Sequence, residues 1–127
     1  MAVDMLQHIN IHVADVERSK QFYTRVLGLR VGPRPPVASV GYWLYLADQP
    51  LIHLVQRPAA GNLPTAGNGA VDHVAFHGID LDATRRLLKA DGVSFHETVI
   101  PRDGTIQLFV HDPDGVKIEL NFDSPWA

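Results

Sequence analysis

The first feature of the chain is a regular alternation of apolar and polar side chains near its start. Within residues 6–13, the apolar Ile9, Ile11 and Val13 alternate with the polar His8, Asn10 and His12. A period of two is typical of a β-strand that buries one face and leaves the other polar. Residues 6–13 are therefore predicted to form a strand.

Two later segments change to the period of an amphipathic helix. They are residues 16–27, in which most apolar side chains fall on one helical face, and residues 81–91. Each is preceded by an aspartate that can accept hydrogen bonds from first-turn amides and followed by a glycine that can adopt positive φ. These residues are Asp15 and Asp80 at the starts, and Gly28 and Gly92 at the ends.

The predicted elements occur twice along the chain. Residues 8–15 and residues 73–80 both read His-x-x-x-His-x-x-Asp, at an offset of 65 residues. Residues 51–54 align with residues 117–120 at an offset of 66. Because several anchors keep nearly one offset, we interpret the chain as an internal repeat.

Each half is predicted to contain a strand, a helix and three further strands. In the first half a short strand ends in a proline-rich turn around residues 29–36, and strands over residues 42–46 and 51–56 form a hairpin with a turn at residues 48–50. In the second half the strands cover residues 93–99, 106–111 and 116–122, with a turn at residues 112–115. The predicted fold class is α+β, with two βαβββ modules in tandem forming a curved, cup-like mixed sheet. Module one spans about residues 5–56, a linker spans about residues 57–70, and module two spans about residues 71–123, all within a single domain.

The composition indicates which kinds of partner and which cellular location to expect. The 127 residues carry a net charge of −3 without a basic cluster, so we expect no nucleic-acid partner. No apolar run reaches the ~18 residues of a membrane span. The chain has no cysteine and 7 histidines, so we expect a cytoplasmic location and a metal, if present, held by nitrogen and oxygen atoms.

Four polar side chains interrupt apolar strands at positions that the repeat relates. Two of them are flanked by apolar residues on both sides, and the other two are followed by apolar residues at the first and third positions after them. Alternation therefore directs all four away from the helix-packing face. A buried carboxylate costs several kcal/mol unless it is paired or binds a metal. We therefore predict a divalent metal site for Fe(II), Mn(II), Zn(II), Ni(II) or Co(II). The predicted ligand set is His8, His53, His73 and Glu119.

One member of this ligand set has an alternative interpretation. His53 can instead orient a ligand or contact substrate without touching the metal. His8, His73 and Glu119 would then form a two-histidine, one-carboxylate triad. The other histidines, at positions 12, 77, 96 and 111, are interpreted as rim or surface residues.

Several motifs resemble the vicinal oxygen chelate superfamily, which includes glyoxalase, bleomycin-resistance proteins, methylmalonyl-CoA epimerase and extradiol dioxygenases. The resemblance covers roughly residues 5–123. The motifs that carry it are His8-Ile9-Asn10, Phe22-Tyr23, Leu27-Gly28-Leu29, Asp72-His73-Val74-Ala75-Phe76, and residues 109–115 running on to Ile118-Glu119-Leu120. In that family the metal ligands occupy positions that match the ligand set. The glyoxalase pattern has a glutamate and the epimerase pattern a glutamine where this chain has His53.

The resemblance implies a metal that chelates two neighbouring oxygens of a small substrate. It favours a glyoxalase-like lyase or isomerase, such as a lactoylglutathione lyase, with Glu119 as the proton shuttle. Two alternatives stay open: a non-haem Fe(II) ring-cleaving dioxygenase, and a metal-free protein that sequesters a drug or ligand, as bleomycin-resistance proteins do.

Substrate contacts are expected on strands next to the ligands. The candidates are Trp43, Tyr45, Gln107 and Phe109, although a register slip of one residue would reverse the face that the last two occupy. Because family members commonly pair, we expect a homodimer, with the site either within one chain or shared between two.

Overall fold

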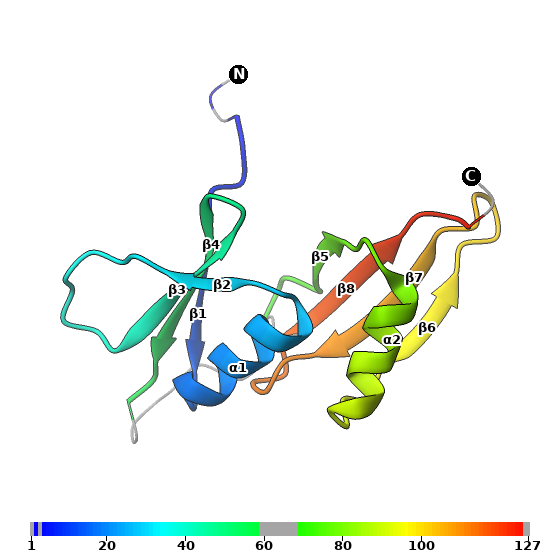
Figure 1. Cartoon of the computed structure of the whole chain (residues 1–127). Helices are drawn as coiled ribbons and strands as arrows, with labels where there is room; N and C mark the ends of the chain where they lie inside the picture. The colour runs from blue at the N-terminus through cyan, green and yellow to red at the C-terminus, as the bar shows by residue number, and fades with distance from the viewer. Residues whose placement is uncertain (1, 3, 59–68, 126–127) are drawn as a thin grey trace. The chain divides into compact units, whose positions relative to one another are not determined.

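The chain divides into two compact units, which are described separately below. The computed structural model describes residue 2, residues 4–58 and residues 69–125. Unit 1 is Met1–Pro64 and unit 2 is Thr65–Ala127. Each contains a four-stranded sheet and one helix (Figure 1). The predicted fold class, with two βαβββ modules in tandem, is confirmed.

Unit 1 forms its sheet from the first strand and the three strands after the helix. Its elements are β1 (Ile9–Val13), α1 (Val16–Val26), β2 (Arg30–Gly32), β3 (Gly41–Leu46) and β4 (Gln49–Gln56). The strand order is β1-β4-β3-β2. β1 runs parallel to β4, and the other pairs are antiparallel.

Unit 2 repeats this topology strand for strand. Its elements are β5 (Val74–His77), α2 (Leu81–Ala90), β6 (His96–Val99), β7 (Ile106–His111) and β8 (Lys117–Phe122). The strand order is β5-β8-β7-β6, with β5 parallel to β8 and the other pairs antiparallel. Most of the predicted linker, residues 59–68, lies outside the described residues.

The helix ends match the prediction. Asp15 accepts a hydrogen bond from a first-turn backbone N–H at 3.2 Å, and Asp80 does so at 3.0 Å. After each helix a glycine adopts positive φ, 71° at Gly28 and 67° at Gly92. Neither helix within the described part of the chain is long and apolar enough to cross a membrane.

The first hairpin is tighter than predicted. Its turn consists of Ala47 and Asp48, and β4 already includes Pro50, which the sequence analysis had assigned to the turn. The register shifts beside Leu51, where a β-bulge interrupts the pairing of β3 and β4. A bulge is one of the few places where a strand tolerates proline, because the ladder hydrogen bonds are already disrupted there.

Two strands begin three residues later than predicted, and other contacts take some of the residues that precede them. Residues 6 and 7 precede β1, and their carbonyls accept hydrogen bonds from the Gln49 side chain. The predicted strand over residues 93–99 begins at His96. The Val93 N–H instead donates to the carbonyl of Leu88 at the end of α2, at 2.8 Å.

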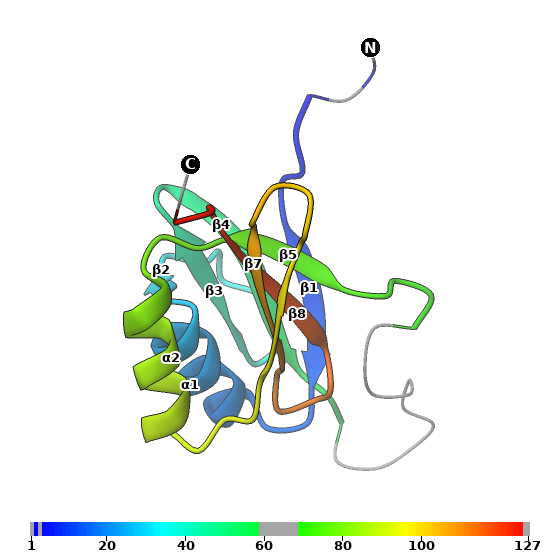
Figure 2. The same cartoon turned by 90° about the vertical axis from the view of Figure 1, so that its right-hand side faces the viewer.

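Each sheet buries one face under its helix and leaves the other face for polar residues. Figure 2 shows both sheets and helices from a second direction. Fully buried apolar side chains from alternate strand positions form the cores. In unit 1 these include Val13, Leu44, Ile52 and Leu54, and in unit 2 Leu108, Val110 and Ile118, which are joined by Leu88 of α2. Alternation then places the predicted metal ligands of β4 and β8 on the opposite faces.

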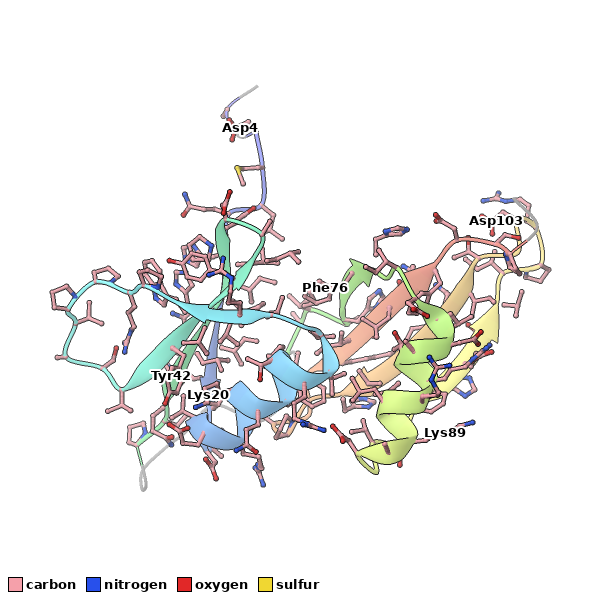
Figure 3. The ribbon with its side chains drawn as sticks, viewed as in Figure 1. Asp4, Lys20, Tyr42, Phe76, Lys89 and Asp103 are labelled. Carbon is pink, nitrogen blue, oxygen red and sulfur yellow. The ribbon has the colours of Figure 1, made fainter. Side chains whose placement is uncertain are left out.

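Each helix also makes a polar contact with a strand of its own sheet. In unit 1 the Tyr42 hydroxyl donates to Glu17, and Lys20 lies 4.7 Å from the centre of the Tyr42 ring (Figure 3). In unit 2 Arg85 donates two hydrogen bonds to Glu97, at 2.9 and 2.6 Å. The acidic group is on the helix in unit 1 and on the strand in unit 2.

Candidate metal centre

Each unit brings together two members of the predicted ligand set. In unit 1 the rings of His8 and His53 are stacked, with centroids 4.0 Å apart. In unit 2 the Nε2 atom of His73 lies 3.7 Å from Oε1 of Glu119. Within residues 4–58 and 69–125, no group of three or more potential ligand side chains is close enough to hold a metal. The structure therefore describes two separate pairs of candidate donors, one within each unit, and each pair is called a half-site below.

The half-site of unit 1 is a stack of three rings. Trp43 of β3 lies opposite His53 of β4 in the antiparallel ladder. The two rings are 4.1 Å apart and inclined by 11°, and His8 covers the other face of His53 at an angle of 6°. His53 is consequently only 7% exposed. Stacking on both faces fixes the plane of the His53 imidazole.

A backbone carbonyl fixes the tautomer of His53. Its Nε2 lies 3.0 Å from the carbonyl oxygen of Pro50. Since a carbonyl only accepts, Nε2 carries the proton and Nδ1 is left with a lone pair. Burial lowers the pKa of His53 below its ordinary value, helped by the nearby charges of His8 and Arg34 and opposed by the Pro50 hydrogen bond. The ring is thus held neutral, which is the form that binds metals.

The other two histidines also have one nitrogen at an oxygen atom. Nδ1 of His8 lies 3.1 Å from Oε1 of Gln7. Nδ1 of His73 lies 2.7 Å from Oδ2 of Asp72, and this hydrogen bond, together with Lys117, lowers the pKa of the Asp72 carboxyl group. In both rings Nε2 is the nitrogen that a metal could use.

Glu119 is held through one of its two oxygens. The side chain is 8% exposed, and Oε2 accepts a hydrogen bond from the Asn121 amide at 2.8 Å. The Asn121 oxygen accepts from the Gln107 amide at 3.2 Å, and the Gln107 oxygen accepts from the Thr98 hydroxyl at 3.1 Å. Thr98, Gln107 and Asn121 form a chain of hydrogen bonds, called the relay below, that ends on Glu119.

The arrangement in unit 2 fits a divalent metal ion, whereas in unit 1 the nearly parallel rings of His8 and His53 would have to turn apart before both could direct a lone pair at one ion. Ligating histidines typically donate their second ring N–H to an oxygen, and all three histidines of the ligand set have an oxygen within hydrogen-bond distance of one nitrogen. Two atoms each about 2.1 Å from one ion lie at most about 4.2 Å apart. The 3.7 Å between His73 and Glu119 is within that limit and too long for a hydrogen bond.

The predicted substrate-binding residues lie on the same faces as the half-sites. Trp43 stacks on His53. The Tyr45 hydroxyl donates to the Pro33 carbonyl at 2.6 Å, and its ring lies under Arg30, 5.3 Å from the guanidinium. Trp43 and Tyr45 therefore each contact a neighbouring side chain through a ring face, which leaves only the uncovered parts of the two rings for a substrate.

The register that the sequence left open is resolved in unit 2. Phe109 pairs with Glu119 and Gln107 pairs with Asn121, so both lie on the Glu119 face. Lys117 covers the Phe109 ring at 5.0 Å. Gln107 is engaged at both amide atoms by the relay.

Sequence reasoning overlooked the residues that orient the ligands. Asn121 follows Glu119 by two positions, so alternation places it on the same face, and that signal was available. Asp72 and Gln7 precede His73 and His8 directly, outside any periodic pattern. The Pro50 carbonyl approaches His53 across the bulged segment, and no sequence pattern predicted that bulge.

Comparison with known proteins shows which family and which proteins this chain is similar to. The family model described as Glyoxalase/Bleomycin resistance protein/Dioxygenase superfamily matches residues 5–120. The chain is 33% identical over 125 residues to Glyoxylase I 4 of Arabidopsis thaliana, covering 94% of this chain and 71% of that protein. It is 35% identical over 125 residues to the lactoylglutathione lyase of Salmonella typhimurium, covering 91% and 90%. It is 29% identical over 126 residues to the mitochondrial methylmalonyl-CoA epimerase of Homo sapiens, covering 91% and 72%.

Solved structures support the same fold. A glyoxylase/bleomycin resistance protein/dioxygenase domain from Frankia sp. superimposes with a TM-score of 0.78 at 20% identity, covering 99% of this chain and 96% of that one. TnmS3, an antibiotic binding protein from Streptomyces sp., superimposes with a TM-score of 0.69 at 23% identity, covering 98% and 99%.

Proposed function

This chain belongs to the Glyoxalase/Bleomycin resistance protein/Dioxygenase superfamily, and from that premise we propose that it is a metal-dependent lyase or isomerase. The relatives named as a lyase and an epimerase support an enzyme of this general kind. The metal is held by the predicted ligand set, His8, His53, His73 and Glu119. The two half-sites serve one ion, supplied by one chain or by the two chains of a homodimer.

One observation carries this proposal. Each of the four side chains has one donor atom engaged by a neighbouring group and a second donor atom left for a metal. Metal ligands typically have such a second contact, which orients them. The neutral state of buried His53 supports the same conclusion.

The chemistry follows from the ligand types. When bound, a divalent metal supplies Lewis acidity to two neighbouring oxygens of a substrate and so makes the adjoining C–H group more acidic. Glu119, when its Oε1 is displaced from the metal, would take the proton from that carbon and return it to the same or the next carbon, as epimerisation or isomerisation requires. Asn121 keeps the other carboxylate oxygen in place during both transfers. Trp43 and His8 shield His53 from water on both ring faces.

The substrate class is a small molecule with two adjacent oxygen functions. A thiol adduct of a 2-oxoaldehyde has this pattern, and a 2-carboxyacyl thioester is a related case in which a carboxylate and a thioester carbonyl flank one C–H carbon. The names of the lyase and epimerase relatives suggest both as first substrates to test.

Metal content and turnover test the proposal together. The wild type purified without added metal, and then loaded with Ni(II), Zn(II), Co(II), Mn(II) or Fe(II), should bind about one equivalent per site. It should then convert methylglyoxal and glutathione to lactoylglutathione, or epimerise methylmalonyl-CoA, with at least one of these metals. His12→Gln is the matched control, because His12 is an exposed histidine of β1 that has no place in the ligand set.

Two results would overturn the proposal. Uptake of less than ~0.1 equivalent of every metal would remove the metal centre. Oxygen consumption with catechols that requires Fe(II), without lyase or isomerase activity, would replace the proposal with the ring-cleaving alternative. A mixture of His53→Gln and Glu119→Gln chains, assayed at a metal concentration too low to fill the His53→Gln site, tests the site arrangement. Regained activity requires a site shared between chains, and its absence indicates a site within one chain.

A ligand-sequestering role is the second candidate, and the aromatic stack of unit 1 favours it. The Trp43, His53 and His8 rings offer parallel flat surfaces that suit planar compounds, and TnmS3 is an antibiotic binding protein of the same fold. Tight binding of a planar drug by metal-free protein, with His8→Ala weakening it, would support this role.

A further inference from the structure

The relay crosses three neighbouring strands of unit 2 without interruption. Thr98 of β6 pairs with Gln107 of β7, and Gln107 pairs with Asn121 of β8. Asn121 then reaches along its own strand to Glu119. The sheet register thus places four polar side chains side by side on one face, and each is hydrogen-bonded to the next.

We propose that Asn121 is a positioning residue for Glu119, and that Gln107 and Thr98 fix the orientation of the Asn121 amide. This inference rests on the proposed function, because it assigns the relay a task at the metal ligand. Asn121 holds Oε2 of Glu119, so that Oε1, on the His73 side, is the donor atom for the metal.

The relay has a direction that follows from its donors and acceptors. Because Oε2 of Glu119 only accepts, the Asn121 amide nitrogen must face it and the Asn121 oxygen must face Gln107. The Gln107 nitrogen donates to that oxygen, which leaves the Gln107 oxygen to accept from Thr98. Without Gln107, the Asn121 amide could rotate and present its oxygen to the carboxylate, which would repel it.

The four residues of this hydrogen-bonded chain differ from an ordinary exposed polar surface. Glu119 is buried, and Thr98, Gln107 and Asn121 are each partly buried. The residues of unit 1 that occupy the pair equivalent to Gln107 and Asn121 are Gly41 and Val55, which have no polar side chain. The relay therefore accompanies the carboxylate ligand and is missing where the ligand is an imidazole.

The same hydrogen bonds change the interpretation of Gln107. The sequence analysis assigns it to substrate binding, but its amide oxygen and nitrogen both serve neighbouring side chains. We assign it to the orientation of Glu119. Replacing Gln107 should then alter metal binding before any substrate is added.

Titration with Co(II), followed by its visible absorption spectrum, tests the relay without measuring turnover. The variants remove one polar group each at similar volume: Asn121→Leu, Gln107→Leu and Thr98→Val. Loss of an outer partner of a metal ligand typically weakens metal binding about 10- to 100-fold. We expect roughly 10-fold weaker Co(II) binding for Asn121→Leu, a smaller loss for Gln107→Leu, and a loss of about 2-fold or less for Thr98→Val.

Asn10→Leu is the matched control. Asn10 is an exposed asparagine of β1 that pairs with the ligand His53 across the sheet of unit 1. Its replacement should leave Co(II) affinity unchanged within about 2-fold, well below the 10-fold loss of an oriented ligand. The Co(II) absorption bands should shift in Asn121→Leu and stay unchanged in Asn10→Leu, because only the former frees both oxygens of Glu119.

The outcomes separate the relay from the proposed function. If the wild type takes up neither Co(II) nor any of the other four metals, the metal-dependent function fails and the relay fails with it. If the wild type binds Co(II) and all three relay variants bind it equally well with the same spectrum, only the relay is refuted. Should Asn121→Leu fail to fold, unchanged affinity and spectrum in Gln107→Leu would refute the relay by themselves.

Discussion

In unit 1 the candidate ligand of β4 is an imidazole held between two aromatic rings, whereas in unit 2 the equivalent ligand of β8 is a carboxylate held by a side-chain amide. Both ligands occupy the same place in the same topology, since Trp43 pairs with His53 as Phe109 pairs with Glu119. The backbone therefore determines where a ligand lies, and the neighbouring side chains determine how it is oriented.

The neighbouring strand positions show why the aromatic stack of unit 1 and the relay of unit 2 could not exchange places. Gly41 pairs with Val55 where Gln107 pairs with Asn121. A Cβ atom added to Gly41 would lie 1.9 Å from the carbonyl oxygen of Leu54, so no side chain can replace that glycine without moving the backbone. The relay has room only in unit 2, and an imidazole, which stacking can orient, serves in unit 1.

The largest expected difference between the units concerns proton transfer. Glu119→Gln should lower kcat of the metal-loaded protein by about 10³-fold, since amides do not accept the substrate proton. His53→Gln should mainly weaken metal binding, by roughly 10-fold, and change kcat much less once metal is saturating. Steady-state kinetics at several metal concentrations separate the two effects. Equal losses of kcat in both variants would contradict the division of roles.

The second prediction concerns the close backbone approach in unit 1. Gly41→Ala should lower the free energy of unfolding by about 2–3 kcal/mol, because the added methyl group overlaps the Leu54 carbonyl. Gln107→Ala, at the equivalent position of unit 2, should cost about 1 kcal/mol for its hydrogen bonds. Urea unfolding followed by circular dichroism gives both values. A Gly41→Ala protein as stable as the wild type would show that this position is not restricted.

The third prediction tests stacking against simple packing. Trp43→Leu should weaken metal binding roughly 2- to 10-fold, because one stacked ring contributes about 0.5–1.5 kcal/mol to the orientation of His53. Phe109→Leu should change it less than about 2-fold, since the relay and not the Phe109 ring orients Glu119. Isothermal titration with Zn(II) measures both affinities. A larger loss for Phe109→Leu would reverse the comparison.

The smallest predicted effect concerns the contact that attaches α2 to its sheet. The two hydrogen bonds from Arg85 lower the pKa of Glu97 below its ordinary value of 4.5. A lowered folded-state pKa stabilises the protein above that ordinary value, and the stabilisation disappears as the pH falls through the folded-state pKa. Solvent screens this partly exposed pair, so the contribution is less than about 1 kcal/mol.

Glu97→Gln isolates this pair in a pH series. The variant should unfold at a lower temperature than the wild type at pH 6–7, as the carboxylate is ionised there in the wild type. The difference should vanish well below pH 4.5, the ordinary value for this group. A difference that persists unchanged in acid would mean that packing, and not charge, connects α2 to β6.

Sequence patterns predicted the fold well because alternation and helix-end residues act locally. Asp15 and Asp80 begin the helices as expected, and the alternation around His53 and Glu119 gives the correct sheet faces. The repeat offset then related the two halves. These features depend on backbone geometry that each segment adopts by itself.

The contacts that orient the ligands were beyond sequence patterns because they depend on register. The bulge beside Leu51 and the placement of Pro50 within β4 arise from pairing with β3, and they bring the Pro50 carbonyl to His53. The relay likewise requires β6, β7 and β8 to align within one residue. A pattern of residue types shows which face a side chain takes, but not which cross-strand neighbour it meets.

The ring stack of unit 1 also gives the protein a built-in optical probe. Trp43 lies in face-to-face contact with the imidazole of a candidate ligand, so its fluorescence should respond when an ion draws electron density from that ring. The chain has only 2 tryptophans, and a Trp126→Phe background would leave Trp43 as the single emitter. Occupancy of one half-site could then be followed in solution, without a substrate and without a coloured metal.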